Sequence, residues 1–331
     1  MNKEQQFEET VQEDEDDLFD LDSDDEDNNF MTTTGNQSEN TNYSTLLTKD
    51  KKVIAFVGTT KNGTSFIVNN LAEMFASMGI ATAVLDLTKS RNAFYIYTNN
   101  EDKLRRQAEE SISKLKSGIA DGVKANKNLS IYTAVPTEKI DYSGSEEVLS
   151  TLVKNYSVVL IDCDFDTPIE YFEKAQEIFL VQSMDVLTIQ PLTAFLRNLK
   201  SKGVLKQEKI KIVLNKFERV RNLSAKALIG GIAFYNDPGM SYMTELFNKD
   251  TVPYCIVPFE TQNYIKYLDS LATCSITLNG YTKTLIKALK DLANIAYPLI
   301  NKQQYYPRGD RYQDNFTDNM NNTLNKMKKY Q

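Results

Sequence analysis

Residues 53–65 read VIAFVGTTKNGTS, a short apolar run that ends at a glycine and continues into a polar segment closed by a second glycine. An uninterrupted apolar run of this length is typical of a parallel strand buried on both faces. Residues 65–78 follow with apolar side chains at helical spacing, and Gly79 fits the end of that helix. The stretch therefore predicts a strand, a glycine-flanked loop and a helix in direct succession.

The same alternation continues along the chain. Further strands are expected at 82–86, 130–135, 157–162, 178–181, 210–214 and 254–257, and further helices at about 100–118, 145–154, 191–201, 223–229 and 282–296. Strands that alternate with helices indicate an α/β fold with a doubly wound, mostly parallel sheet. We expect this domain to occupy residues 51–300.

Charge is distributed unevenly. The 331 residues carry a formal net charge of -7, but residues 1–30 hold fourteen acidic residues and one lysine, so the rest of the chain is mildly basic at +6. Residues 1–50 combine this acidity with few large apolar residues, and we expect a disordered tail. It is interpreted as a solubilising tail, with a docking peptide around Leu18, Phe19 and Leu21 as the alternative.

Residues 301–331 form a second polar segment. Phe316, Met320, Leu324 and Met327 recur in it at spacings of four, four and three, beside three lysines, Lys326, Lys328 and Lys329. This pattern is typical of a short basic amphipathic helix that binds a membrane surface or a partner groove. A weakly helical tail without function is the alternative.

Composition excludes several kinds of chemistry. The chain has no histidine, which excludes His-based acid–base catalysis, Ser-His-Asp triads and His-ligated zinc. Cys163, Cys255 and Cys274 are scattered, without the CxxC spacing of a thiolate metal site. There is no G-x-G-x-x-G after a strand, so a dehydrogenase fold is not supported. The acidic start differs from a signal peptide, and no apolar run approaches about 20 residues, so we expect a cytoplasmic protein.

The loop after the first strand has the frame G-x-x-x-x-G-x-S of a phosphate-binding P-loop. Its eight residues are Gly58, Thr59, Thr60, Lys61, Asn62, Gly63, Thr64 and Ser65. Glycines at both ends permit a tight wrap, successive amides form an anion nest, and Ser65 is placed to bind Mg²⁺. The lysine of the motif is missing, because position 64 is threonine. A plain strand-to-helix turn with glycines is the alternative.

Residues 52–297 resemble the ParA/MinD family of deviant Walker P-loop NTPases, which have a SIMIBI-type fold. The resemblance rests on the blocks VGTTKNGTSFIVNNLA, TAVLDLTKSRN, YSVVLIDCDFD and IKIVLNKF, in the family's order, and on a later VPYCIVPFE. It implies that residues 58–65 bind the phosphates of ATP or ADP, that Asp162 lies near Mg²⁺ with Ser65, and that Asn215 contacts the base. It also matches Asp86 to the first aspartate of the strand after the loop helix. Ordinary strand-end carboxylates are the alternative for Asp86 and Asp162.

The departures from the family's pattern concern hydrolysis. Active members have lysines where this chain has Thr59 and Thr64, and a water-orienting aspartate where it has Thr88. Phosphoryl transfer depends on positioned charge around the γ-phosphate. Lys61 does not replace three groups. We therefore name no catalytic residue and expect nucleotide binding with weak or no hydrolysis.

Degenerate loops on this fold resemble the TadZ/CpaE branch, which localises pilus and secretion machinery. The resemblance implies a homodimeric pseudo-ATPase scaffold that docks on a protein partner of a membrane-associated or polar assembly. The alternative is an active partition-type ATPase that binds DNA or membrane in an ATP-dependent cycle. The lysine clusters look more like solvated helix faces than a phosphate-binding stripe, so DNA is not favoured.

Overall fold

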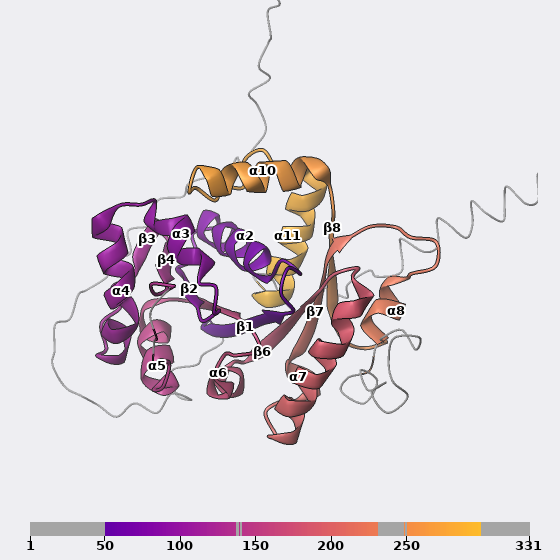
Figure 1. Cartoon of the computed structure of the whole chain (residues 1–331), viewed down its shortest axis with the longest axis horizontal. Coiled ribbons are helices and arrows are strands. Elements are labelled where there is room, and N and C mark those ends of the chain that lie inside the picture. Colours follow the sequence, from indigo (N-terminus) through magenta and orange to yellow (C-terminus); the bar gives the residue numbers. More distant parts are fainter. Residues whose placement is uncertain (1–49, 137–138, 140, 231–247, 249, 299–331) are drawn as a thin grey trace, which may run out of the picture. The chain divides into compact units, whose positions relative to one another are not determined.

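The computed structural model describes residues 50–298, except 137–138, 140, 231–247 and 249. In this part an eight-stranded sheet has the order β3-β4-β2-β5-β1-β6-β7-β8 (Figure 1). The strands are β1 Lys52–Gly58, β2 Thr82–Asp86, β3 Val123–Asn126, β4 Leu129–Tyr132, β5 Val158–Cys163, β6 Glu177–Gln182, β7 Ile210–Phe217 and β8 Tyr254–Pro258. Within this sheet β3 pairs antiparallel with β4, and the other pairs are parallel. The predicted α/β class with a mostly parallel sheet is confirmed.

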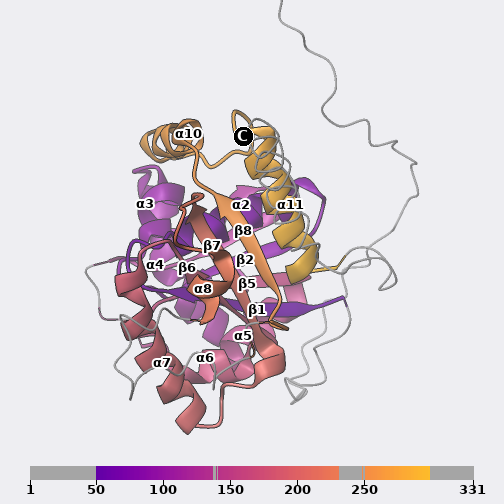
Figure 2. The same ribbon diagram turned by 90° about the vertical axis from the view of Figure 1, so that its right-hand side faces the viewer.

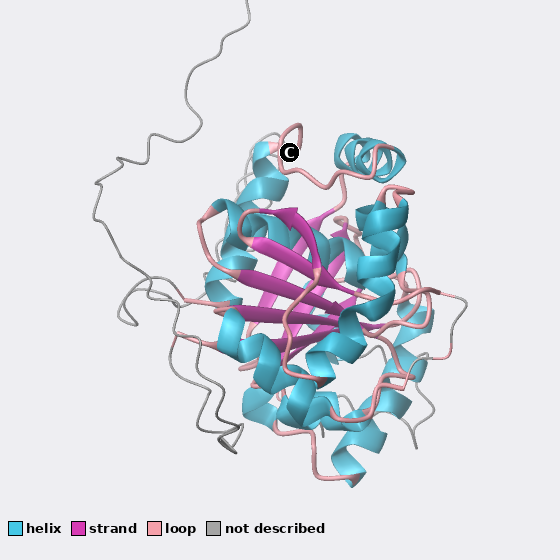
Figure 3. Cartoon of the chain, turned by 90° about the vertical axis from the view of Figure 1, so that its left-hand side faces the viewer, coloured by secondary structure: helices cyan, strands magenta, loops and turns pink. Residues whose placement is uncertain are grey.

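Helices cover both faces of the sheet (Figure 3). They are α2 Thr64–Ser77, α3 Asn92–Thr98, α4 Asp102–Lys116, α5 Ser145–Asn155, α6 Ile169–Lys174, α7 Ile189–Ser201, α8 Ala225–Gly230, α10 Thr261–Ala272 and α11 Lys283–Ala296, with short 3₁₀ turns η1 Val186–Thr188 and η2 Gln207–Lys209. Side chains of α5, α6 and α7 belong to one apolar core, and those of α2 and α11 belong to the other. The sheet is therefore doubly wound.

Strand β1 is central and buried on both faces. Val53, Ala55 and Val57 face the core of α5 to α7, whereas Ile54 and Phe56 face the core of α2 and α11. This two-sided burial explains why the strand reads as a continuous apolar run. Because β1 pairs with β5 on one side and β6 on the other, the loop that follows it lies in the middle of the sheet's carboxyl edge.

Helix α11 is attached to the domain along its length and at both of its ends. It packs on α2 and beside β8 (Figure 2). At its start the Thr282 side chain caps the helix by accepting from the Leu285 amide, and at its end the Ala296 carbonyl accepts from Lys52 Nζ. Within the described part of the chain, none of the helices combines the length and apolar content that a bilayer crossing requires.

Candidate functional site

Both glycines of the predicted phosphate loop lie where a side chain does not fit. A Cβ on Gly58 would lie 2.5 Å from the Val181 carbonyl oxygen and 2.7 Å from Thr64 Oγ1. Gly63 has a φ of 88° and forms the N-cap of α2, and a Cβ there would collide with the Asn215 amide. The tight wrap between β1 and α2 therefore depends on these two positions.

The side chain of Asn62 fixes the loop from inside. It is buried, and its Nδ2 donates to Thr59 Oγ1 at 2.5 Å and to Thr188 Oγ1 at 3.3 Å. Its Oδ1 accepts from Ser183 Oγ at 2.8 Å. These bonds tie the middle of the loop to its own start, to the residue after β6 and to η1. A buried amide with its hydrogen bonds satisfied holds one loop conformation.

A second set of contacts comes from β7. Asn215 Nδ2 donates to the main-chain oxygen of Asn62, and Lys216 Nζ donates to the main-chain oxygen of Lys61, each at 2.8 Å. Lys216 and Lys61 both have positive φ angles, 54° and 70°. Two loop carbonyls therefore point toward β7 and accept hydrogen bonds from its side chains.

The first turn of α2 is open to an anion. In the described part of the chain no side chain caps this helix, so the amides of its first turn are not satisfied by a cap. The helix dipole adds partial positive charge at the same point. The loop's side chains are neutral apart from Lys61, which is exposed. The loop can thus offer main-chain donors and hydroxyls to a phosphate, with little formal charge.

One carboxylate oxygen of Asp162 has no hydrogen-bond partner among the described residues. Asp162 lies on β5 near its carboxyl end and is buried, and the unpartnered atom is Oδ1. Burial raises its pKa well above the ordinary value, the neighbouring Asp86 raises it further, and the Ser65 hydroxyl acts in the opposite direction. A buried carboxylate oxygen without a hydrogen bond is costly. A hard cation near Asp162 and Ser65 would relieve that cost, and the two oxygen donors fit Mg²⁺.

The structure gives Asp86 a different surrounding. It lies beside Asp162 in register across β2 and β5, but its carboxylate accepts from the Thr88 amide at 3.0 Å and hydroxyl at 2.6 Å and from the Ala93 amide at 3.1 Å. Burial raises the pKa of Asp86, and these hydrogen bonds lower it. Asp86 therefore holds the turn after β2 in place.

Thr88 completes that turn. Its hydroxyl donates to Asp86 and accepts from the Arg91 amide at 3.1 Å. At this position the family pattern has the aspartate that orients water. The segments after β2 and β5 are also linked, because the Lys89 amide donates to Asp164 Oδ2 at 2.6 Å.

The structure thus brings the eight loop residues, which include Ser65, together with Asp162 and Asn215 at the carboxyl edge of the sheet around β1. Sequence reasoning missed the supports Ser183, Thr188 and Lys216, and treated Asn62 only as a loop position. Ser183 and Thr188 belong to no motif, so their contact with the loop could not be found from spacing. A polar residue directly before the second loop glycine was the one available signal for Asn62.

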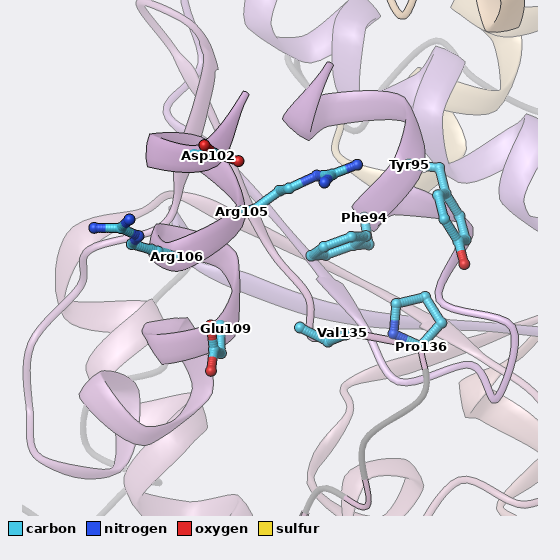
Figure 4. Close-up of a pocket in the computed structure, with 8 residues that line it drawn as sticks. All are labelled: Phe94, Tyr95, Asp102, Arg105, Arg106, Glu109, Val135 and Pro136. Carbon is cyan, nitrogen blue, oxygen red and sulfur yellow. The ribbon is translucent and has the colours of Figure 1, made fainter. Parts of the chain in front are cut away.

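A pocket of about 490 Å³ lies elsewhere, between α3 and α4, lined by Phe94, Tyr95, Asp102, Arg105, Arg106, Glu109, Val135 and Pro136 (Figure 4). Arg105 extends from α4 toward the aromatic side chains of α3 (Figure 4). None of the loop residues lines this pocket. Its two arginines are offset by two carboxylates, so it does not offer a phosphate a net positive surface.

Comparison with solved structures agrees with the fold. MinD in the MinC:MinD cell division complex of Aquifex aeolicus is 16% identical, with a TM-score of 0.54, over 77% of this chain and 99% of that one. McdA of Cyanothece, in its complex with ATP, is 13% identical, with a TM-score of 0.53, over 77% and 99%. A putative plasmid partition protein of Borrelia burgdorferi B31, bound to AMPPNP, is 13% identical, with a TM-score of 0.52, over 74% and 98%.

At these identities the similarity defines the fold, which is that of the MinD/ParA P-loop NTPases. No protein-family model matches the sequence, and no curated protein matches it.

Proposed function

We propose that this protein is a ParA/MinD-like nucleotide-binding scaffold with weak or no hydrolysis, which localises or assembles a larger machine through dimerisation and partner docking. One observation carries the proposal. The loop of residues 58–65 is fixed by Asn62, Asn215 and Lys216 in front of an uncapped helix, yet the positions that would supply catalytic charge are neutral.

In this proposal the loop amides hold the phosphates of ATP or ADP. Ser65 and Asp162 hold Mg²⁺, whose charge offsets both the phosphates and the buried carboxylate when it is bound. Asn215 Nδ2 donates one of its two hydrogens to the loop, so its second N–H and its Oδ1 are left to contact the base. Asp86 positions the turn of residues 88–93 beside the site.

Weak or absent hydrolysis follows from the charges that are missing. Removing one preorganised donor from a transition state costs a rate factor of about 10²–10³. Here Thr59, Thr64 and Thr88 replace two cations and one carboxylate of active members, and the Thr88 hydroxyl is occupied by Asp86. Nucleotide binding needs only the loop and the metal. It is therefore retained when the cations and the carboxylate that hydrolysis requires are lost.

The scaffold role extends the same reasoning. A site that binds but does not turn over suits a protein whose dimer state or partner binding depends on nucleotide. One solved neighbour is a MinC:MinD complex, which supports a protein partner here. The homodimer in this proposal follows from the resemblance of the sequence to the ParA/MinD family. We further propose TadZ/CpaE-like recruitment from the cytoplasm to a pilus, secretion or other polar membrane assembly. In this proposal the domain of residues 51–300 binds nucleotide, residues 1–50 solubilise the protein, and residues 301–331 contact a partner or a membrane.

The test is calorimetry of the full chain with ATP and ADP, with and without Mg²⁺, followed by phosphate release on the same samples. We expect Mg²⁺-dependent binding without release. Ser65→Ala should weaken binding about tenfold by removing a metal ligand, which corresponds to about 1.4 kcal/mol. Ser77→Ala, at the other end of α2, is the matched control and should bind as the wild type does.

The other outcomes decide against the proposal. Absence of binding at millimolar nucleotide would contradict a nucleotide site. Clear turnover would instead favour the alternative, an active partition-type ATPase, particularly if ATP also induced salt-sensitive retention on DNA.

A further inference from the structure

Helix α10 turns its apolar side to solvent. Tyr264, Ile265 and Leu268 are 49%, 60% and 45% exposed, and Phe259, just before the helix, is 37% exposed. The Phe259 and Tyr264 rings lie 6.2 Å apart, and Leu268 follows Tyr264 by one turn. These four side chains form one surface, called the α10 patch below.

The inward side of α10 is polar. Its buried residues are Asn263 and Ser270. Asn263 donates to Thr282 Oγ1 at 3.0 Å and accepts from the Thr282 amide at 2.9 Å, and Ser270 Oγ accepts from Lys266 Nζ at 3.1 Å. Tyr267 adds an edge-on contact with Phe66, with ring centroids 4.8 Å apart. These contacts attach α10 to the domain, and the residues of the α10 patch take no part in them. A contiguous exposed apolar surface of this kind marks an interaction site.

The end of the described chain lies within reach of this patch. Helix α11 starts beside α10, through the bonds between Thr282 and Asn263, and ends at Ala296 after 14 residues. That helix is about 21 Å long. The 17 residues 299–315 can span up to about 56 Å when extended, so the sequence beyond them can return to α10.

We propose that residues 312–331 of the same chain, which lie outside the described residues, cover the α10 patch. In sequence, Phe316, Met320, Leu324 and Met327 follow spacings that place them on one face of a helix. Packing this apolar face on the α10 patch removes both from water.

The test is hydrogen exchange of the α10 amides in the full chain, without nucleotide. Met320→Glu/Leu324→Glu places charge on the proposed contact face and should speed exchange in α10 about tenfold. Asn322→Glu/Asn325→Glu adds the same charge on the opposite face of the proposed helix and should leave α10 exchange unchanged. Ile265→Ser/Leu268→Ser should reciprocally speed exchange of residues 316–327.

Three results would overturn the proposal. Equal α10 exchange in wild type and Met320→Glu/Leu324→Glu would show that the tail does not cover the patch. Protection that depends on protein concentration and tracks a dimer in sedimentation would assign the patch to a second copy. Tail-dependent binding to anionic vesicles with unchanged α10 exchange would assign the tail to lipid. None of these readouts depends on nucleotide binding, so they are independent of the proposed function.

Discussion

The side-chain amide of Asn215 and the main-chain oxygen of Asn62 are joined by a 2.8 Å hydrogen bond between residues 153 positions apart in the chain. Both residues are buried. Because the neighbouring Lys216 also binds a loop carbonyl, the conformation of the phosphate loop depends on the end of β7 as well as on β1 and α2.

Asn215→Ala should therefore destabilise the fold. It leaves the buried carbonyl of Asn62 without this donor, at a cost of about 1–3 kcal/mol. Denaturant unfolding measures the change, and calorimetry should show weaker nucleotide binding. Asn155→Ala removes a similar amide-to-carbonyl bond, to Thr151 at the end of α5, where the site is not involved. Unaltered nucleotide binding in Asn215→Ala would show that the contact does not position the loop.

Gly63→Ala and Gly79→Ala form a matched pair. Both glycines have positive φ angles, 88° and 77°, so each alanine carries a left-handed backbone cost of about 1–2 kcal/mol. Only at Gly63 would the new Cβ also meet Asn215, whereas the space at Gly79 is open. We expect Gly63→Ala to be the more destabilising in thermal unfolding. Equal losses would mean that Asn215 moves aside at no cost.

Asp162→Asn should give a pH-dependent gain in stability. Burial raises the folded-state pKa of Asp162 above the ordinary 3.8 of the unfolded chain, so the folded protein retains a proton that the unfolded chain loses. Wild-type stability therefore falls as pH rises from about 4 through the raised pKa, and that loss is absent in the variant. The difference in melting temperature should grow from pH 4 to pH 8.

Asp166→Asn is the control for this experiment, because Asp166 is exposed close by. It should show little change at any pH. If Asp162 holds Mg²⁺, Asp162→Asn should also weaken Mg²⁺-dependent nucleotide binding while it stabilises the fold. A stability difference that is constant with pH would contradict the assigned cause.

Thr64→Lys restores one missing cation. A charge-assisted hydrogen bond of about 1.5–3 kcal/mol should raise ATP affinity roughly 10- to 100-fold. Hydrolysis should stay low, because Thr88 still lacks a carboxylate, and phosphate release measures this. Ser77→Lys adds the same charge at the far end of α2 and should leave affinity unchanged. Rapid turnover in Thr64→Lys alone would show that Thr88 is not limiting.

The fold could be predicted where burial is strong on both faces. The expected strands at 53–57 and 157–162 differ from β1 and β5 by about one residue at each end, because an apolar run reports two-sided burial directly. Strand β3 was missed, since Lys124 is exposed and its four residues show little periodicity. Helix α10 was missed because its apolar residues face outward and its buried ones are polar, which reverses the usual pattern.

The part of the site that is contiguous in sequence could also be predicted. The loop frame is contiguous in sequence, so its glycines and Ser65 could be recognised together. The support of Asn62 comes from Ser183 and Thr188, which follow β6, and from Asn215, which lies in β7. They meet the loop after β1 because β1, β6 and β7 are consecutive in the sheet. Such contacts depend on strand order, which no local pattern contains.

The close contacts at Gly58 and Gly63 bear on how such a loop can change. Neither position accepts a side chain without moving its neighbours, whether or not a ligand is ever bound. By contrast, Lys61 is exposed, and the Thr64 hydroxyl itself fills part of the space beside Gly58. The glycine frame is therefore a requirement of architecture, and the cations are a requirement of chemistry alone. A chain of this fold can give up catalysis in a few substitutions and still retain the outline of the motif.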